Sequence, residues 1–286
     1  MPESAAKVSI IIVTHNSLPV LETCLKHLQV AAESIQHEII VVDNNSSDNS
    51  PTFVKNFCPR AKLHLNRQNK GFASACNTGA ELAESALLLF LNPDLFLDQP
   101  AITELLNGYS RSERVGVVVG RLRFPDGKFQ PTCRRLPTIS NILFSRRGVI
   151  GLFSKENSRY TLPDYDKITA VPAAAATLLM ISKKLFKQIG RFDERFFMYM
   201  EDTDLSKRLI MAGFKNYFVP AAGAVHDWGE GSQAGALKRS FYHHMSLYRY
   251  FSKHRQDWLA RFVFPLPLLV NFILVNLLAM IRKPFR

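Results

Sequence analysis

The chain has 286 residues, 47% of them apolar, so it is long enough to bury a substantial core in one large domain or two small ones. Its 36 Lys and Arg residues against 24 Asp and Glu give a net charge of +12, which favours an anionic partner such as nucleic acid, lipid or a phosphorylated substrate. The sequence contains no zinc-finger, helix-turn-helix or aromatic-interleaved basic motif, so we do not expect nucleic acid to be that partner.

The first 130 residues alternate strand and helix patterns. Continuous apolar or alternating runs predict strands at 7–14, 37–43, 61–66, 86–92 and 115–120. Helical spacing or helix-start residues lie between them, at 18–32, 48–57 and 71–84. This order predicts an α/β fold with a mostly parallel sheet, and Pro125-Asp126-Gly127 predicts a hairpin at its end.

Polar residues follow the predicted strands at one edge of this sheet, where ligands bind in open parallel sheets. Asp43 ends the second strand and can accept a hydrogen bond from a ribose hydroxyl or a base N–H, unless its turn only caps the next helix. Asp94 lies in the turn Asn92-Pro93-Asp94 and can bind Mg²⁺ together with substrate phosphates, although this turn is also common without a ligand. The turn Asn69-Lys70-Gly71 adds a cation and a residue suited to positive φ.

The second half of the chain is less regular. Residues 131–167 are basic and show little periodicity, and we expect the apolar run 168–182 to lie along the edge of the sheet. Helices are predicted at 182–190 and 201–213. Glu201, Asp202 and Asp204 lie in the first turn of the latter, where the helix dipole favours acids. Three acids exceed what capping needs, so one is a candidate general base.

His226 and the four cysteines are further residues with reactive or ligating side chains. His226 follows a short strand, and such a residue is either structural or a metal ligand. The four cysteines form no C-x-x-C pair, which favours free thiols in a reducing compartment. The first residues show no signal-peptide pattern, so we expect the protein to work on the cytoplasmic side.

The C-terminal segment combines positive charge with apolar residues. Residues 234–286 hold nine basic residues and one acidic residue, and 236–259 is predicted as a basic, aromatic helix. Residues 262–281 are uncharged, and 20 residues of helix span roughly 30 Å, the thickness of a bilayer core. Pro265 and Pro267 disturb the first turn. We therefore expect membrane association, either by a spanning helix or by a buried or interfacial helix pair.

Taken in order, six motifs resemble glycosyltransferase family 2, in its rhamnosyltransferase-like branch of bacterial polysaccharide assembly. They are VSIIIVTHNS, IIVVDNNSSD, NKGFASACNTG, FLNPD, FDERFFMYMEDTDLSKR and VHDWGEGS. The resemblance implies the Rossmann-like GT-A fold, a mostly parallel sheet flanked by helices, over residues 1–233. Residues 1–120 would form its nucleotide-binding half and 121–233 its acceptor and catalytic half. Residues 234–286 would add a basic helix and an apolar, membrane-associated tail.

The resemblance also implies roles for individual residues on the donor side. Thr14, Asn16 and Asp43 would contact the nucleoside of a nucleotide-sugar donor. Asn69, Gly71 and Asn77 would line its diphosphate and sugar.

Further roles concern the metal and the catalytic base. Asp94 looks like the last acid of the family's D-x-D motif, which holds Mg²⁺ or Mn²⁺, and Asn92 occupies the first position of that motif. His226 resembles a late histidine that completes the metal or diphosphate site. Asp202 matches the catalytic base, with Glu201 beside it as a second catalytic candidate.

The implied reaction is an inverting transfer to a lipid-linked or polysaccharide acceptor, and the branch resembled favours L-rhamnose from dTDP-rhamnose as the donor. The site would lie at the cytoplasmic face of the inner or plasma membrane. A UDP-hexose-dependent transferase and a non-catalytic, membrane-bound partner of a polysaccharide assembly complex remain alternatives. One departure from the family leaves the identity of the sugar open. The family usually has a Gly-Ala pair where this chain has Ala173–Ala176. We expect the methyl group that replaces the glycine hydrogen to narrow the acceptor or donor pocket.

Overall fold

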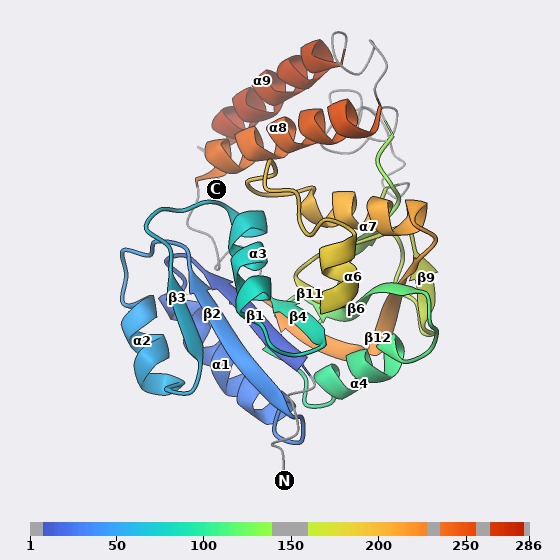
Figure 1. Cartoon of the computed structure of the whole chain (residues 1–286). Helices are drawn as coiled ribbons and strands as arrows, with labels where there is room; N and C mark the ends of the chain where they lie inside the picture. Colours follow the sequence, from blue (N-terminus) through green and yellow to red (C-terminus); the bar gives the residue numbers. More distant parts are fainter. Residues whose placement is uncertain (1–7, 139–159, 228–234, 256–263, 283–286) are drawn as a thin grey trace.

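A computed structural model of the chain describes residues 8–138, 160–227, 235–255 and 264–282. Within these residues, a large mixed sheet carries helices on both faces (Figure 1). The strands are β1 (Val8–Thr14), β2 (His37–Asp43), β3 (Lys62–Leu65), β4 (Leu87–Leu91), β5 (Leu95–Leu97), β6 (Val115–Arg123), β7 (Phe129–Gln130), β8 (Cys133–Arg134), β9 (Thr169–Val171), β10 (Ala173–Ala174), β11 (Leu178–Ser182) and β12 (Lys215–His226). The helices are α1 (Leu18–Ala31), α2 (Ser50–Phe57), α3 (Phe72–Leu82), α4 (Ala101–Tyr109), α6 (Lys183–Gln188), α7 (Glu201–Met211), α8 (Ala236–His254) and α9 (Pro265–Arg282).

The main sheet has the strand order β3-β2-β1-β4-β11-β6-β12-β5. β1 pairs in parallel with β2 and with β4, and β2 pairs in parallel with β3, so the predicted parallel half of the sheet is confirmed. Their carboxyl ends therefore share one edge. The predicted hairpin is also present, because β7 pairs antiparallel with β6 around a Gly127 with φ of 81°.

The prediction that residues 168–182 lie along the edge of the sheet holds only for β9, which pairs with β12 outside the main strand order, and is wrong for β11. The segment divides into three strands, and β11 lies inside the sheet, antiparallel to β4 and β6. Its residues Leu178 to Ile181 are almost fully buried, because helices cover both faces of the sheet there. An unbroken apolar run is what a strand buried on both faces requires, so the same pattern fits the centre of the sheet better than its edge.

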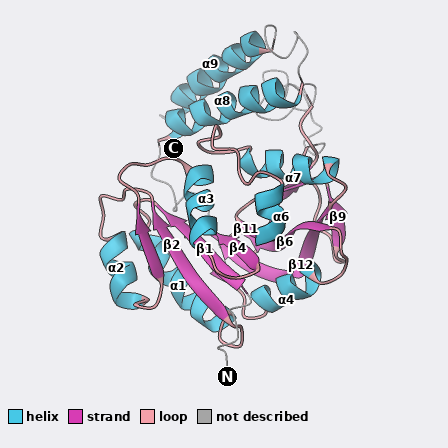
Figure 2. Cartoon of the chain, in the orientation of Figure 1, coloured by secondary structure: helices cyan, strands magenta, loops and turns pink. Residues whose placement is uncertain are grey.

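Two apolar layers hold the helices to the sheet. Alternate residues of β1 divide between them: Ile10 and Ile12 pack with α1, α2 and α4, whereas Ile11 packs with α3, α6 and α7. Figure 2 shows these helices on the two faces of the magenta sheet. The arrangement leaves the ends of the strands, rather than the faces of the sheet, available for a ligand.

α8 and α9 form an antiparallel pair beside the sheet domain (Figure 1). A third cluster joins the pair to the chain before α7, through Phe196, Met200, Leu247, Tyr250 and Phe264 among others. Asn271 bonds His244 and Asn276 bonds Ser240, so both polar residues of the apolar tail face α8. Of the two alternatives from the sequence, a spanning helix and a helix pair, the structure has the helix pair. In the described part of the chain, no helix is long and apolar enough to cross a membrane.

The predicted domain boundaries stay predictions. β6 runs across the proposed division between residues 120 and 121, and the third cluster packs α8 and α9 against residues 196–200.

Candidate active site

The loops that follow β1, β2 and β3, residues 14–17, 43–49 and 66–71, form a connected set that we call the strand-end loops. Asn16 has a positive φ of 53°, and its side-chain oxygen accepts hydrogen bonds from the N–H groups of Ser47 (2.7 Å) and Asp48 (3.3 Å). The carboxylate of Asp43 accepts from the backbone N–H of Ser46 at 2.9 Å and from its hydroxyl. Turn chemistry thus explains the position of Asp43, and each carboxylate oxygen retains a lone pair for a ligand.

Asn44, which the sequence reading did not single out, holds these loops together. Its amide group donates to the Asn69 side chain at 2.9 Å and to the carbonyl of Gly71 at 3.1 Å. Its side-chain oxygen accepts from Asn66 and from the N–H of Lys70, both at 3.1 Å. Because Asn44 is 2% exposed, it acts as a buried support for the turn after β3.

Gly71 and Asn77 connect the strand-end loops to the second half of the chain. Gly71 has φ of 86°, and a Cβ there would lie 2.4 Å from the carbonyl oxygen of Phe197. Asn77 bonds the backbone N–H and carbonyl of Phe192 and the carboxylate of Glu194. Both residues therefore fix the chain that leads to α7, and their predicted contacts with a diphosphate or sugar stay predictions.

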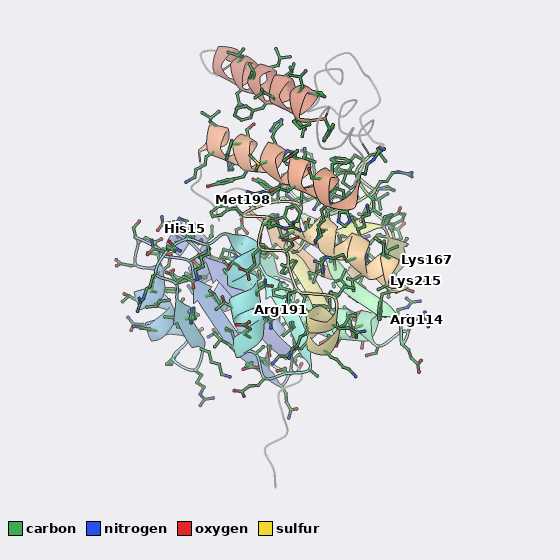
Figure 3. All side chains as sticks on the ribbon, turned by 45° about the horizontal axis from the view of Figure 1, so that its top comes forward. His15, Arg114, Lys167, Arg191, Met198 and Lys215 are labelled. Carbon is green, nitrogen blue, oxygen red and sulfur yellow. The ribbon has the colours of Figure 1, made fainter. Side chains whose placement is uncertain are left out.

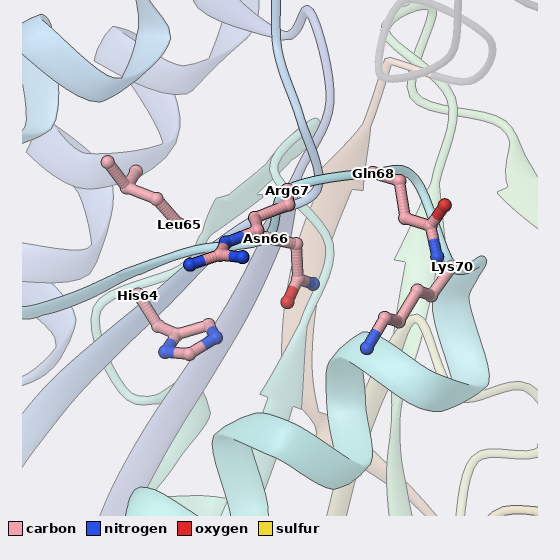
Figure 4. Close-up of a pocket in the computed structure, with 6 residues that line it drawn as sticks. All are labelled: His64, Leu65, Asn66, Arg67, Gln68 and Lys70. Carbon is pink, nitrogen blue, oxygen red and sulfur yellow. The ribbon is translucent and has the colours of Figure 1, made fainter.

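A cavity of about 500 Å³ lies at the end of β3, lined by His64, Leu65, Asn66, Arg67, Gln68 and Lys70. Figure 4 shows His64 and Arg67 on one side of it and Gln68 and Lys70 on the other, with the amide of Asn66 between them. Two cations and several hydrogen-bonding groups suit an anionic, hydrogen-bonding ligand such as a nucleotide. Thr14 is fully buried at the end of β1, and its hydroxyl has no partner among the described residues.

Asp94 and His226 meet at the carboxyl end of β4. β5 pairs with the end of β12, which places His226 opposite Leu95 and brings its Nε2 to 3.3 Å from Asp94 Oδ1. The other ring nitrogen, Nδ1, lies 2.8 Å from the side-chain oxygen of Gln130, which can only accept, so Nδ1 donates. Asn92 precedes this pair, with its N–H bonded to the carbonyl of Thr177 at 3.0 Å.

This pair fits a divalent cation as a partial donor set. With Nδ1 donating, Nε2 of a neutral His226 turns its lone pair toward a carboxylate, and such a contact requires a proton or a cation between the two atoms. Second-shell support of the kind that Gln130 gives is usual for histidine ligands. No group of three or more His, Cys, Asp or Glu side chains suited to a metal occurs in the described ranges, so a bound diphosphate would have to supply further ligands.

The first turn of α7 contains two adjacent buried acids. Asp202 forms an ion pair with Arg134 of β8 and accepts from the N–H and hydroxyl of Thr203. Burial, and then the charge of Asp202, raise the pKa of Glu201 well above its usual range, despite the nearby Arg134. Glu201 therefore tends to keep its proton, so Asp202, the partner of Arg134, is the better candidate for a proton acceptor.

A short segment joins the two clusters. Gln130 contacts His226, and Arg134, four residues later, contacts Asp202. Four extended residues span at most about 14 Å, so both clusters lie within reach of one small ligand. The Ala173–Ala176 segment lies along this connection, because β10 pairs with β8 and the N–H of Ala175 donates to the carbonyl of Thr132 at 3.0 Å.

Helix α8 holds the chain that enters α7. Tyr199 and Met200 both have a φ of 69°, a conformation that costs energy for residues with side chains. The Ser246 hydroxyl donates to the carbonyl of Met198 at 2.9 Å, and Phe197 stacks on Tyr242 with ring centroids 4.5 Å apart. Figure 3 shows Met198 next to α8, toward the same end of the molecule as His15.

The third acid of α7 has a structural role. Asp204 is fully buried and bonds Arg208 at 2.8 Å, Lys253 at 2.7 Å and His254 at 2.8 Å, and the last two belong to α8. These partners outweigh burial and lower the pKa of Asp204. Sequence motifs do not identify several residues that support the site, because these residues belong to no recognisable motif. Only their contacts in the structure reveal them: Asn44, Gln130, Arg134 and the residues of α8.

Comparisons with known proteins agree on the family. The model of the family described as Glycosyl transferase family 2 matches residues 9–190. N-acetylglucosaminyl-diphospho-decaprenol L-rhamnosyltransferase of Mycobacterium tuberculosis is 30% identical over 264 residues, covering 87% of this chain and 85% of the relative. Rhamnosyltransferase WbbL of Escherichia coli is 26% identical over 259 residues, covering 87% and 94%.

A solved structure shows the same fold at low identity. Mannosyltransferase PcManGT from Pyrobaculum calidifontis, in complex with GDP-Man and Mn²⁺, superposes with a TM-score of 0.59 at 17% identity. The superposition covers 98% of this chain and 76% of that one. The fold is thus GT-A-like, with a mixed, mostly parallel sheet flanked by helices.

Proposed function

The chain belongs to glycosyltransferase family 2, and from that premise we propose that it transfers a sugar, with inversion, from a nucleotide-sugar donor to a lipid-linked glycan. The observation that carries this proposal is the segment from Gln130 to Arg134, which joins the Asp94–His226 pair to Asp202. A group that holds a diphosphate and a group that accepts a proton are the two requirements of this reaction.

In the proposed reaction, the acceptor hydroxyl lies against Asp202. Its oxygen forms a bond to the anomeric carbon, while the bond from that carbon to the diphosphate oxygen breaks on the opposite face. The electron pair of the broken bond leaves with the nucleoside diphosphate, and Asp202 takes the hydroxyl proton. Glu201 already holds its proton, so it does not compete for this one.

Mg²⁺ or Mn²⁺, when bound, would be held by Asp94 and His226 and would supply positive charge to the leaving diphosphate. The strand-end loops bind the rest of the donor. Asp43 and Thr14 offer hydrogen bonds to the nucleoside, while Arg67 and Lys70 supply positive charge beside it. Asn16 and Asn69 keep these loops in place for this contact, and the N–H of Asn92 fixes the turn after β4 to the carbonyl of Thr177.

L-rhamnose from a dTDP donor is the favoured sugar, because two relatives that each cover 87% of this chain are named as rhamnosyltransferases. One of them acts, by its name, on an N-acetylglucosaminyl diphosphate lipid, so we propose an acceptor of that class here.

The C-terminal helix pair supports a site at a membrane surface. Five apolar residues of α9 are 43–66% exposed and fall on one stripe: Leu266, Leu269, Val270, Ile273 and Leu277. Nine basic residues against one acidic residue in 234–286 suit an anionic leaflet. A cavity of about 380 Å³ lies between α8 and residues 194–197. We propose that the protein works on the cytoplasmic face of the plasma membrane, with α9 lying on the bilayer.

The deciding experiment measures nucleoside diphosphate release by the purified protein from a panel of nucleotide sugars, with an N-acetylglucosaminyl diphosphate lipid as acceptor. Parallel samples contain Mn²⁺, Mg²⁺ or EDTA. Acceptor-dependent release from one donor, lost in EDTA, is the expected result. Binding of lipid or nucleotide without any transfer would contradict the proposal and favour the non-catalytic partner.

Flotation with vesicles of anionic and neutral phospholipid tests the location. The full chain should float with anionic vesicles, and Leu269→Asp with Ile273→Asp should reduce this binding. Met211→Asp is the matched control, because Met211 is 74% exposed but lies on α7. Wild-type protein that stays unbound at low salt would refute membrane docking.

A further inference from the structure

Three buried polar atoms, in the segment that reaches Asp202 through Arg134 and in the first turn of α7, have no hydrogen-bond partner among the described residues. They are Oγ1 of Thr132, Nε of Arg134 and Oε2 of Glu201. Native proteins pair the large majority of such atoms, so each exception requires an explanation. Three exceptions next to a candidate catalytic base indicate a ligand that would pair with them.

The ion pair between Arg134 and Asp202 joins the two segments that carry these groups. Thr132 and Arg134 are alternate residues of an extended segment, so their side chains project on the same side, whereas Cys133 between them packs into the core. Arg134 reaches Asp202, whose neighbour in the chain is Glu201. The N–H of Ala175 fixes the carbonyl of Thr132, so the segment cannot easily turn these groups elsewhere.

The chemistry of the three groups suits a polyol better than an anion. A hydroxyl, a guanidinium N–H and a carboxyl group can together accept from and donate to neighbouring sugar hydroxyls. The charge of Arg134 is already balanced by Asp202, so it offers little net attraction to a phosphate. Burial and Asp202 raise the pKa of Glu201, which lets its carboxyl group donate a hydrogen bond at neutral pH.

We propose that Thr132, Arg134 and Glu201 bind the hydroxyls of the acceptor sugar that lie beside the reacting one. The assignment rests on the proposed function, because it is Asp202 that identifies where the reacting hydroxyl lies. It makes these residues determinants of which acceptor sugar, and which of its positions, receives the transferred group.

The first test uses Thr132→Val, which removes the hydroxyl and keeps the shape. The probes are dTDP-L-rhamnose and N-acetylglucosaminyl diphosphate on a short alkyl chain. We expect KM for the acceptor to rise about tenfold, since a charge-free hydrogen bond is lost, with the donor KM and kcat little changed. We expect Tm to change little, because the neighbour of the hydroxyl in the free protein is the Cys133 thiol, which is only a weak hydrogen-bonding group.

The control is Ser252→Ala, which removes another buried hydroxyl without a partner in the described chain, on α8. It should change neither KM nor Tm. A loss of stability in Thr132→Val equal to its loss of affinity would overturn the proposal in favour of a structural role. A rise in the donor KM alone would overturn the assignment to the acceptor.

Deoxy analogues of the acceptor probe identify the partner hydroxyl. An analogue that lacks the hydroxyl bound by Thr132 should lose affinity with the wild type but not with Thr132→Val. If, for every analogue, the loss of affinity caused by the missing hydroxyl is the same in the wild type and in Thr132→Val, Thr132 does not contact any of these hydroxyls.

Glu201→Gln, which can still donate, should retain acceptor affinity, and Glu201→Leu should lose it. Equal affinities in these two variants would count against the carboxyl group as a partner. The affinity for the acceptor probe, measured by calorimetry, tests the subsite even if no transfer is detected. Absence of transfer by the wild type refutes the proposed function, whereas wild-type binding that Thr132→Val leaves intact refutes the subsite.

Discussion

The strand-end loops and the acid helix α7 are positioned by different means. Within the loops, Asp43 is held by Ser46 and Asn69 by the N–H of Gly71 in short turns, while Asn16 and Asn44 join these turns to one another across 22 to 32 residues of chain. The acids of α7 are held by side chains from β8 and α8, 49 to 68 residues away: Arg134 for Asp202, and Lys253 and His254 for Asp204. The loops form a lattice held mainly by hydrogen bonds, whereas the acid helix depends on paired charges. Changes in the loops should therefore alter donor affinity, and changes around α7 should alter the rate of transfer.

The largest expected effect comes from Asp202→Asn. Loss of the general base should reduce kcat by about 10²- to 10⁴-fold, while donor binding stays near the wild-type value. The measurement is steady-state transfer with calorimetric donor binding on the same preparation. Glu201→Gln is the matched control, because Glu201 is protonated and its substitution should cost far less rate. Substantial transfer by Asp202→Asn would remove Asp202 from the role of base.

Asp94→Ala tests the metal side of the comparison. This variant should lose the part of donor affinity that depends on Mn²⁺, and binding in EDTA should not change. Gln130→Leu should weaken metal-dependent donor binding by about 10- to 100-fold, because it removes the outer partner of His226. Asp98→Asn is the control, since Asp98 follows β5 but pairs with Arg123. Metal-dependent binding that survives Asp94→Ala would place the cation elsewhere.

Asn44→Ala tests whether the strand-end loops behave as one lattice. It leaves several buried groups of the turn after β3 without partners, so the free energy of unfolding should fall by about 1–3 kcal/mol. KM for the donor should rise with little change in kcat. Urea unfolding and donor kinetics measure both effects, with Asn107→Ala, an exposed residue of α4, as control. A fall in kcat at constant donor KM would contradict the division of labour between loops and acid helix.

The sequence predicted the loops better than the acid site, for a physical reason. Asp43, Asp94 and Asn69 follow strands in short turns, and strand ends at one edge must meet in a parallel sheet. Helix α4 and the three-residue strand β5 were not predicted, although Asp98-Gln99-Pro100 provides a turn directly before α4. Arg134 lies in an irregular segment with no periodicity, and its contact with Asp202 depends on the path of the whole chain between them. The predicted contacts of Asp43 and Asn77 with the donor stay predictions.

The pH dependence of stability tests the raised pKa of Glu201. Its pKa is raised in the folded protein, so between the ordinary pKa of a glutamate and this raised value the unfolded chain has lost a proton that the folded protein retains. Stability should therefore fall as pH rises through this window, by about 1.4 kcal/mol for each pH unit. Glu201→Gln should remove that slope in thermal unfolding followed against pH. Parallel slopes in both proteins would show that Glu201 ionises normally.

Ser246→Ala is the smallest change and asks whether α8 positions the acids or only covers them. It removes the bond to the carbonyl of Met198, just before the two residues at positive φ that lead into Glu201. Stability should fall by about 1 kcal/mol. If α8 positions the acids, kcat should also fall severalfold while both KM values hold. Ser240→Ala is the control on the same helix, because its hydroxyl bonds Asn276 of α9 and lies away from residues 196–200. A loss of stability in Ser246→Ala with unchanged kcat would show that α8 stabilises the acid helix without setting its geometry.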